Sequence, residues 1–175
     1  MPSRKRKREV NNTDEQHMET DEDTKHGILE AFKDAAVATG IHKAVERGCI
    51  EVVQFLVREE QADVNKAKTG SGTTPLYIAV QNGHIEIVQF LVREGQADVN
   101  KARTDDGATP LYIAAKNGHI EIVQFLVREW QADVNKARTD SGTTPLYIAA
   151  QTGHMETVQF LVREGQADVN KARTD

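Results

Sequence analysis

The sequence is short of the residues on which several classes of protein depend. It has one cysteine, Cys49, among 175 residues, which excludes an internal disulfide framework and a multi-cysteine zinc site. No run approaches the roughly 18 consecutive apolar residues of a membrane helix, and no apolar segment follows the basic start to serve as a secretory signal. We therefore expect an intracellular protein, in the nucleus or the cytoplasm, with no membrane partner.

The chain also has little excess of either charge. Its 22 Lys+Arg and 27 Asp+Glu residues leave a formal net charge of -5, whereas a protein that binds the phosphate backbone needs a broad positive surface. Nucleic-acid binding is therefore not expected, except weakly through one basic cluster near the start, which consists of Arg4, Lys5, Arg6, Lys7 and Arg8.

This basic cluster belongs to a charged segment with almost no apolar side chains. Residues 9–23 supply seven carboxylates, and such a stretch buries too little apolar surface to order itself. We expect residues 1–25 to be a disordered tail. The cluster matches a nuclear import signal or a weak nucleic-acid patch, and the alternative is a solvating tail whose two halves attract each other. Apolar spacing then predicts a capping helix over residues 26–38.

The remainder of the chain repeats itself with a period of 35 residues. Three long near-copies follow one another over residues 61–95, 96–130 and 131–165. A fainter copy occupies about residues 39–60, and residues 166–175 begin a further unit without its helices. The sequence thus predicts one repeat domain over residues 26–175.

The first half of each unit predicts a short helix. Thr74 before Pro75 is an N-cap hydroxyl followed by a first-turn proline, so a helix is expected to start there. The apolar residues of one face follow at helical spacing, namely Leu76, Ala79 and Val80. The Asn82-Gly83 pair is expected to end this helix, because both residues tolerate a positive φ.

The second half predicts another helix and a projecting loop. Residues 84–94 are apolar on one side and polar on the other, and residues 96–107 are rich in Asp, Asn, Lys and Gly. A lone unit buries too little apolar surface to offset the entropy of ordering its residues. Stacking of unit on unit removes this deficit, so we expect a solenoid.

These units resemble the ankyrin repeat family. The segments that carry the resemblance are Gly72-Thr73-Thr74-Pro75-Leu76-Tyr77-Ile78-Ala79, Gly83-His84-Ile85-Glu86-Ile87-Val88 and Ala97-Asp98-Val99-Asn100, with counterparts in the next two units. The resemblance implies an all-α solenoid of stacked helix-turn-helix units with projecting β-hairpin-like loops. This chain departs from the family pattern where tyrosine replaces the histidine after Thr-Pro-Leu, at Tyr77, Tyr112 and Tyr147.

The units also exceed the family's usual length of about 33 residues by two. One added residue is Gln96, after Gly95. Position 95 is occupied by Trp130 in the next unit, so we do not expect it to require a left-handed backbone throughout. At the far end, the outer flank of the last helix pair, around Val158 and Leu161, has no capping unit, so either the chain continues in nature or that flank is exposed.

Residues that could carry chemistry are few. His84, His119 and His154 recur once per unit, on the order of 10 Å apart, which is too far to share one metal ion. No nucleophile elbow, phosphate-cradling glycine loop or His-Glu-x-x-His motif occurs. We therefore expect no enzyme activity, no cofactor and no metal. Cys49 is expected to fill a gap near a helix start, with a reactive thiol as the alternative.

The differences between near-copies point to a binding surface. Units 61–95 and 96–130 differ at seven positions, six of which lie in the loop tip or the last turn of the first helix. The ankyrin resemblance implies that loop tips and first helices form a concave face that grips other proteins. The predicted contact residues are Gly70, Ser71, Thr73, Gln81, Asn82, Asp105, Asp106, Ala108, Lys116, Asn117, Asp140, Ser141, Thr143, Gln151 and Thr152.

The alternative explanation is that exposed positions drift freely. Drift alone would also have changed the outer side of the second helix, yet residues there are identical in the three copies, for example Gln89, Gln124 and Gln159. Trp130 is either a binding anchor or, as we expect, a residue that packs across the neighbouring loop.

The sequence therefore predicts a non-catalytic module, monomeric, that binds a protein partner through the concave face. Two other functions stay open. One is a nuclear regulatory subunit that masks a transcription factor, and the other is the targeting arm of a longer enzyme.

Overall fold

The computed structural model describes residues 40–171. The predicted tail, its basic cluster Arg4–Arg8 and the predicted capping helix over residues 26–38 lie outside the described residues. Within residues 40–171 the regular elements are all α-helices. Residues 40–46 are helical and precede α2 (Ile50–Arg58).

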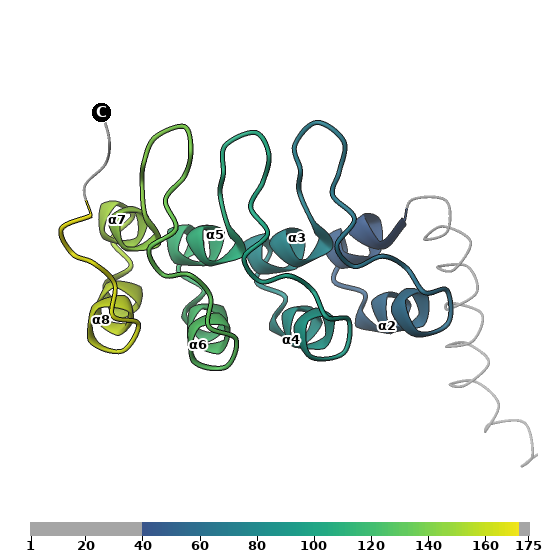
Figure 1. The fold of residues 1–175 in the computed structure, drawn as a ribbon. Helices are drawn as coiled ribbons and strands as arrows, with labels where there is room; N and C mark the ends of the chain where they lie inside the picture. Colours follow the sequence, from purple (N-terminus) through teal and green to yellow (C-terminus); the bar gives the residue numbers. More distant parts are fainter. Residues whose placement is uncertain (1–39, 172–175) are drawn as a thin grey trace, which may run out of the picture.

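The other helices come in three pairs, which are α3 (Pro75–Gln81) with α4 (Ile85–Arg93), α5 (Pro110–Asn117) with α6 (Ile120–Arg128), and α7 (Pro145–Gln151) with α8 (Met155–Arg163). Figure 1 shows the pairs stacked side by side, with α3, α5 and α7 in one row and α2, α4, α6 and α8 in a second row. The loops project from the row of first helices, away from the second row. The predicted all-α solenoid is confirmed.

The first helices begin where the sequence predicts. The Oγ1 atoms of Thr74, Thr109 and Thr144 each accept a hydrogen bond, at 3.2 Å, from the backbone N–H three residues later. Proline follows each threonine at the first helical position. The threonine side chain thus satisfies a backbone donor that the helix itself leaves free.

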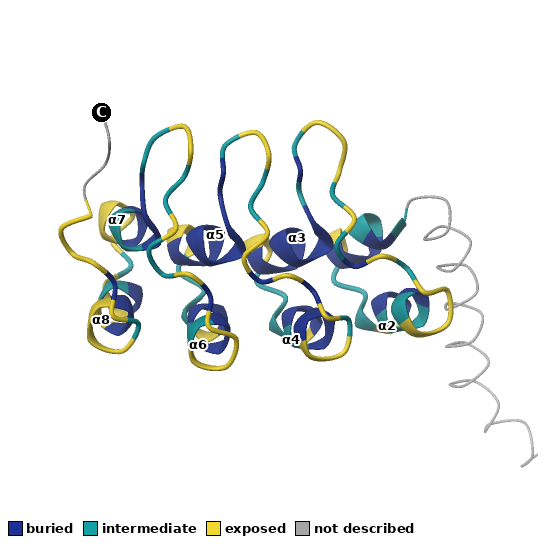
Figure 2. Ribbon diagram, viewed as in Figure 1, coloured by how far each residue is buried: buried dark blue, intermediate teal, exposed yellow. Residues whose placement is uncertain are grey.

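The core runs along the stack between the two rows of helices (Figure 2). The spacing of Leu76, Ala79 and Val80 predicts one apolar face for the first helix, whereas every residue from Pro75 to Val80 in α3 is buried. This wider burial arises because a first helix contacts both its own second helix and neighbouring first helices, as α5 contacts α6, α3 and α7. The second helices bury one side only, as predicted, with Ile87, Val88 and Leu91 as examples.

The residue added after position 95 has a specific role in the backbone. Gln96 has a φ of 57°, and the equivalent Gln61, Gln131 and Gln166 have φ values between 50° and 54°. The left-handed residue that turns the chain out of the second helix is therefore glutamine. Gly95 does not have a positive φ, in agreement with the expectation from Trp130.

The outer flank of the last pair differs from the prediction in part. Leu161 is fully buried, and Val158 is half-buried. The apolar side chains exposed at this end are Met155, Val162 and Val169.

Candidate protein-binding surface

The projecting loops are closed by backbone hydrogen bonds and linked to one another. In the loop before α5, Arg103 N–H donates to the carbonyl of Ala108 at 2.9 Å. Neighbouring tips are joined by two further bonds of this kind, Thr104 N–H to Ser71 O at 3.2 Å and Thr139 N–H to Asp106 O at 3.0 Å. No β-strand forms within the described residues, so these loops are turns that support one another along the stack.

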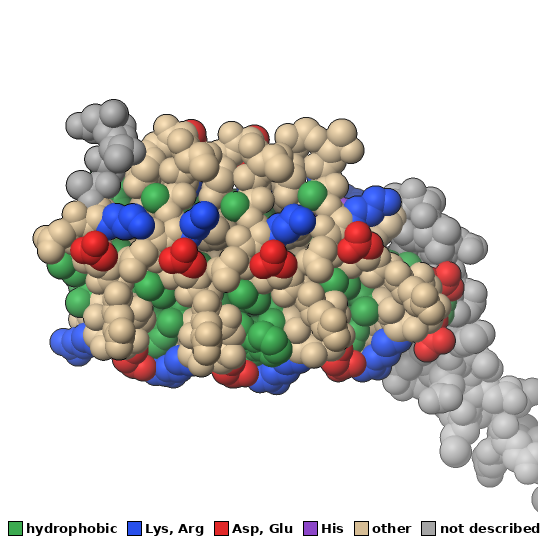
Figure 3. All heavy atoms as spheres, viewed as in Figure 1, with side chains coloured by type: hydrophobic (Ala, Val, Ile, Leu, Met, Phe, Trp, Pro, Cys, Tyr) green, Lys and Arg blue, Asp and Glu red, His purple; other side chains and the backbone are tan. Residues whose placement is uncertain are grey.

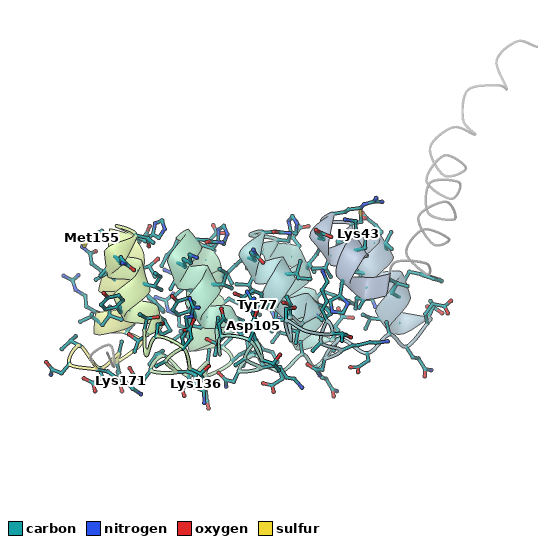
Figure 4. All side chains as sticks on the ribbon, turned by 90° about the horizontal axis from the view of Figure 1, so that it is seen from above. Lys43, Tyr77, Asp105, Lys136, Met155 and Lys171 are labelled. Carbon is teal, nitrogen blue, oxygen red and sulfur yellow. The ribbon has the colours of Figure 1, made fainter. Side chains whose placement is uncertain are left out.

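The tyrosines that replace the family's histidine connect the loops to the first helices. The Arg103 guanidinium lies over the Tyr77 ring, 5.4 Å from its centroid, and Arg138 lies over Tyr112 at the same distance. Burial raises the pKa of the Tyr77 hydroxyl above its usual value. Arg103 contacts both Tyr77 and Asp105, which Figure 4 labels in the middle part of the stack. Each cation–π contact joins the first helix of one unit to the loop of the next.

The carboxylates of the loop tips are paired with these arginines. Arg103 donates to Asp105 through Nε at 3.0 Å, and this hydrogen bond lowers the pKa of Asp105. Arg138 contacts Asp140 of its own loop at 2.5 Å and Asp106 of the previous loop at 3.1 Å. The acidic side chains at the tips are therefore locally neutralised, and Asp106 ties one loop to the next.

Most of the predicted contact residues lie at the surface. The exposed ones are Gly70, Gln81, Asn82, Asp105, Lys116, Asn117, Asp140, Gln151 and Thr152. The half-buried ones are Ser71, Thr73, Asp106 and Ser141. Ala108 and Thr143 are buried, because they lie on the returning side of their loops and their carbonyls close those loops. These two residues therefore do not present a side chain to a partner.

Two of the exposed residues also hold neighbouring units together. The amide of Asn82 donates to the carbonyl of Glu46 at 3.3 Å, and the amide of Asn117 donates to the carbonyl of Gln81 at 2.9 Å. In the last unit Thr152 donates instead to Ile148 of its own helix, at 2.8 Å. The side-chain amides of Asn82 and Asn117 thus already donate hydrogen bonds between units.

The recurring histidines pack between units. A Cβ atom added at Gly83 would lie 2.9 Å from the His119 ring, and one at Gly118 would lie 2.5 Å from the His154 ring. The Nε2 atoms of His119 and His154 lie 3.3 Å and 2.9 Å from carbonyl oxygens of the preceding unit. Within residues 40–171, no three His, Cys, Asp or Glu side chains are grouped closely enough to hold a metal ion.

The outer side of the second helices carries a second set of contacts between units. Three ion pairs join consecutive units, Arg58–Glu94, Arg93–Glu129 and Arg128–Glu164, at 2.5–2.8 Å. The same arginines lie over the rings of Phe90, Phe125 and Phe160. Figure 3 shows alternating basic and acidic side chains along this edge. The identity of Arg93 and Arg128 therefore has a structural reason, so it is a weaker argument against drift than the identity of the glutamines.

The one tryptophan contacts an aromatic ring of its own unit. The Trp130 ring is tilted by 50° against that of Phe125 in its own unit, with 6.5 Å between the ring centroids, and Trp130 is more than one-third exposed. Shallow grooves lie between the second helices, and one of them is lined by residues of α2 and α4 that include Gln54, Phe90 and Arg93. These features are on the opposite side of the molecule from the loop tips.

We call the exposed residues Gly70, Gln81, Asp105, Lys116, Asp140 and Gln151 the tip-and-helix surface. The differences between copies predict these residues as contact residues. They missed Arg103 and Arg138, which position the tips, and the substitution of tyrosine for histidine was the signal that could have pointed to them.

A comparison with known protein families identifies the repeat. The model described as ankyrin repeats, three copies, matches residues 24–103, 41–138 and 97–173. The chain belongs to the ankyrin repeat family. Ankyrin repeats are generally protein–protein interaction modules and are typically non-catalytic. No curated protein matches the chain. In the described part of this ankyrin protein, every helix is too short or too polar to span a membrane.

Proposed function

We propose that this ankyrin protein binds a protein partner through the tip-and-helix surface. The observation that carries the proposal is the linkage of the loop tips. The backbone bonds between tips and the Asp106–Arg138 contact fix each tip relative to its neighbour before any partner arrives. A preorganised surface loses less conformational entropy on binding than a mobile one.

The chemistry of this surface indicates the kind of partner contact. Asp105 and Asp140 already face arginines, whereas Gln81, Lys116 and Gln151 occupy one position in three successive units and are all exposed. Two amides and one ammonium in a row suit hydrogen bonding to polar side chains and backbone carbonyls. We therefore expect recognition by shape and hydrogen bonds, with a weak dependence on salt.

Site-directed photo-crosslinking tests this proposal. A photoreactive amino acid is placed at position 81, 116 or 151 of the full chain in its own cells, and matched variants carry it at Glu86, Glu121 or Glu156 on the second helices. All six positions are exposed. We expect one protein to be captured from the first three positions and not from the matched ones. Capture from the second helices alone would contradict the proposal.

An affinity measurement with the captured protein sharpens the test. Replacement of Lys116 by glutamate is expected to weaken binding about tenfold, which corresponds to about 1.4 kcal/mol. The matched control, Glu121→Lys, is expected to leave the affinity unchanged. Equal affinity for both variants and the unmodified chain would show that the partner binds elsewhere.

A further inference from the structure

The outer side of the second helices is divided into two bands. At the carboxyl ends of the helices, arginines and glutamates pair between units, as in Arg58–Glu94 at 2.6 Å, so the charges of this band neutralise one another. At the amino ends, each helix carries one exposed glutamate in its first turn. None of these glutamates forms an ion pair with a basic side chain of residues 40–171, so this band has an uncompensated negative charge. The four are Glu51, Glu86, Glu121 and Glu156.

A glutamine follows three residues after each of these glutamates, on the same face of the helix. Within the described part of the chain, the side-chain amides of these glutamines make no hydrogen bond. A first-turn glutamate is stabilised by the helix dipole, whereas nothing in the fold requires a glutamine at this position. Its recurrence in all four units therefore favours a contact with another molecule. The four are Gln54, Gln89, Gln124 and Gln159.

These polar side chains line adjoining grooves between the second helices. The groove between α2 and α4 contains the first-turn glutamate and the glutamine of both helices, and its apolar lining includes Ile50 and Phe90. The groove between α4 and α6 contains Gln89 and the same two residues of α6, and its apolar lining includes Ile85 and Phe125. Gln89 lines both grooves, and the second helices stand side by side in one row (Figure 1). The surface therefore repeats its chemistry from α2 to α6.

This chemistry selects a cationic polypeptide as the occupant. Carboxylates without a cation attract Lys or Arg side chains, and free amides, which both donate and accept, suit the N–H and C=O groups of a backbone. Packed helices lie about 8–10 Å apart. A polyproline II helix has three residues per turn and rises about 3.1 Å per residue, so every third side chain lies on one side, about 9 Å from the next. Its backbone groups are also free to bond with the amides.

We propose that α2, α4 and α6 bind a basic segment of another protein in the polyproline II conformation. The segment crosses the three helices, and Lys or Arg side chains at every third residue pair with Glu51, Glu86 and Glu121. The glutamine that follows each glutamate on the same face hydrogen-bonds the backbone of the segment. The proposal goes beyond partner binding at the tip-and-helix surface, because the two surfaces lie on opposite sides of the molecule and both can be occupied at once.

The basic cluster of the chain itself is less complementary to this surface. Arg4 and Lys7 are three residues apart, but the next residue in that series is Val10. The other series, Lys5 and Arg8, continues to an asparagine. The cluster can therefore meet two of the glutamates and not three, and the seven carboxylates of residues 9–23 would be repelled by the same surface. A segment of another protein is the occupant that the observations favour.

Fluorescence anisotropy with the full chain tests the proposal. The probe is a labelled peptide that consists of three Lys-Pro-Thr repeats and a final lysine. The comparison peptide has the same composition, with its lysines consecutive. We expect the probe to bind about fivefold more tightly than the comparison peptide, because only its charges match the spacing of the units. Equal affinities would overturn the proposal, since the attraction would then depend on charge alone.

Two double variants with the same change in net charge locate the contact. Glu51→Gln with Glu86→Gln is expected to weaken binding of the probe about tenfold, because two of the three pairs are lost. Glu59→Gln with Glu60→Gln is the matched control. These glutamates follow α2, are also exposed and have no ion pair within residues 40–171, and the control should change the affinity less than about twofold. Equal weakening by both double variants would contradict the proposed site.

The central glutamine tests the contact with the backbone of the segment. Gln89→Ala is expected to weaken binding of the probe about threefold, and high salt should not remove this effect, because the interaction is between neutral groups. Lys116→Glu, on the tip-and-helix surface, should leave the affinity for the probe unchanged. Loss of probe binding in Lys116→Glu would overturn the proposal, whereas loss of the other partner alone in that variant concerns only the function proposed above.

Two further measurements in the full chain identify the natural occupant. A photoreactive amino acid at position 89, in the protein's own cells, is expected to crosslink to a segment with Lys or Arg at every third residue, as read by mass spectrometry of the crosslinked peptide. A crosslink to a segment without this pattern would overturn the proposal. So would an increase of about tenfold in affinity for the probe when the basic cluster is replaced by serines, because the chain's own cluster would then be the occupant. The replaced residues are Arg4, Lys5, Arg6, Lys7 and Arg8.

Discussion

The unit at residues 96–130 and the unit at residues 131–165 have nearly the same sequence and different degrees of burial. Leu111 is buried in the former, whereas the equivalent Leu146 is half-buried in the latter. Both leucines are the second residue of their helices, after the same Thr-Pro pair. The shared helix starts show that a unit forms its helices from local signals. The difference in burial shows that the unit on each side completes its core.

Truncation of a core leucine is expected to have the largest effect, and to destabilise the two units by different amounts. Leu111→Ala removes a side chain that both neighbours enclose, and we expect it to lower the free energy of unfolding by about 3–5 kcal/mol. Leu146→Ala should cost about 1–2 kcal/mol, because part of this side chain is already in contact with solvent. Urea unfolding of the two variants at low protein concentration measures both values. Equal losses would show that burial does not depend on neighbours.

Removal of the helix caps is expected to affect the two units equally. Thr109→Ala and Thr144→Ala each remove an acceptor for a backbone N–H at 3.2 Å, which costs about 1–2 kcal/mol. The interaction lies within one helix, so its loss should not depend on position in the stack. Thr144→Ser, which keeps the acceptor, is the control and should lose much less. A cap effect confined to one unit would contradict the local origin of the helices.

Substitution of a left-handed glutamine by glycine is expected to stabilise the protein, in contrast to the preceding substitutions. Gln131→Gly replaces a residue with a φ of 50° by one that adopts this conformation without steric cost, and the free energy of unfolding should rise by about 0.5–1 kcal/mol. Gln166→Gly, after the last helix, should give the same gain. The matched substitution Gln124→Gly, inside α6, should instead destabilise the protein by about 1 kcal/mol.

How far the sequence predicts the fold depends on whether the signal is local. The Thr-Pro start and the length of each helix follow from neighbouring residues, and the structure confirms them. The left-handed Gln96 was not predicted, because its conformation is imposed by the turn that returns Ala97 N–H to Leu91 O at 2.9 Å. Glutamine has no intrinsic preference for that region.

The candidate site was predictable to a smaller extent, because it depends on contacts between units, which are not local in the sequence. Differences between copies pointed to the loop tips. The pattern did not separate the outward side of a loop from the returning side, so Ala108 and Thr143 were included although they are buried. The contact between Arg103 and Tyr77 joins two units, and such contacts depend on how the units stack. Whether a partner binds the tips is a prediction that the crosslinking experiment addresses.

The smallest expected effect concerns the ion pairs of the second helices. Arg93→Ala removes an exposed pair with Glu129 and a contact with the Phe125 ring, and such groups contribute about 0.5–1 kcal/mol together. Arg163→Ala should have almost no effect in dilute protein, because the following unit that would pair with it is not among residues 40–171. High salt should reduce the difference between the two variants.

Hydrogen exchange resolved by residue in dilute protein tests the central claim most directly, namely that neighbouring units complete one another's core. The account predicts that backbone amides of residues 122–126 in α6 exchange at least tenfold more slowly than those of residues 157–161 in α8, although both helices are nine residues long. Equal exchange rates in the two helices would contradict it, because each unit would then be stable without the next.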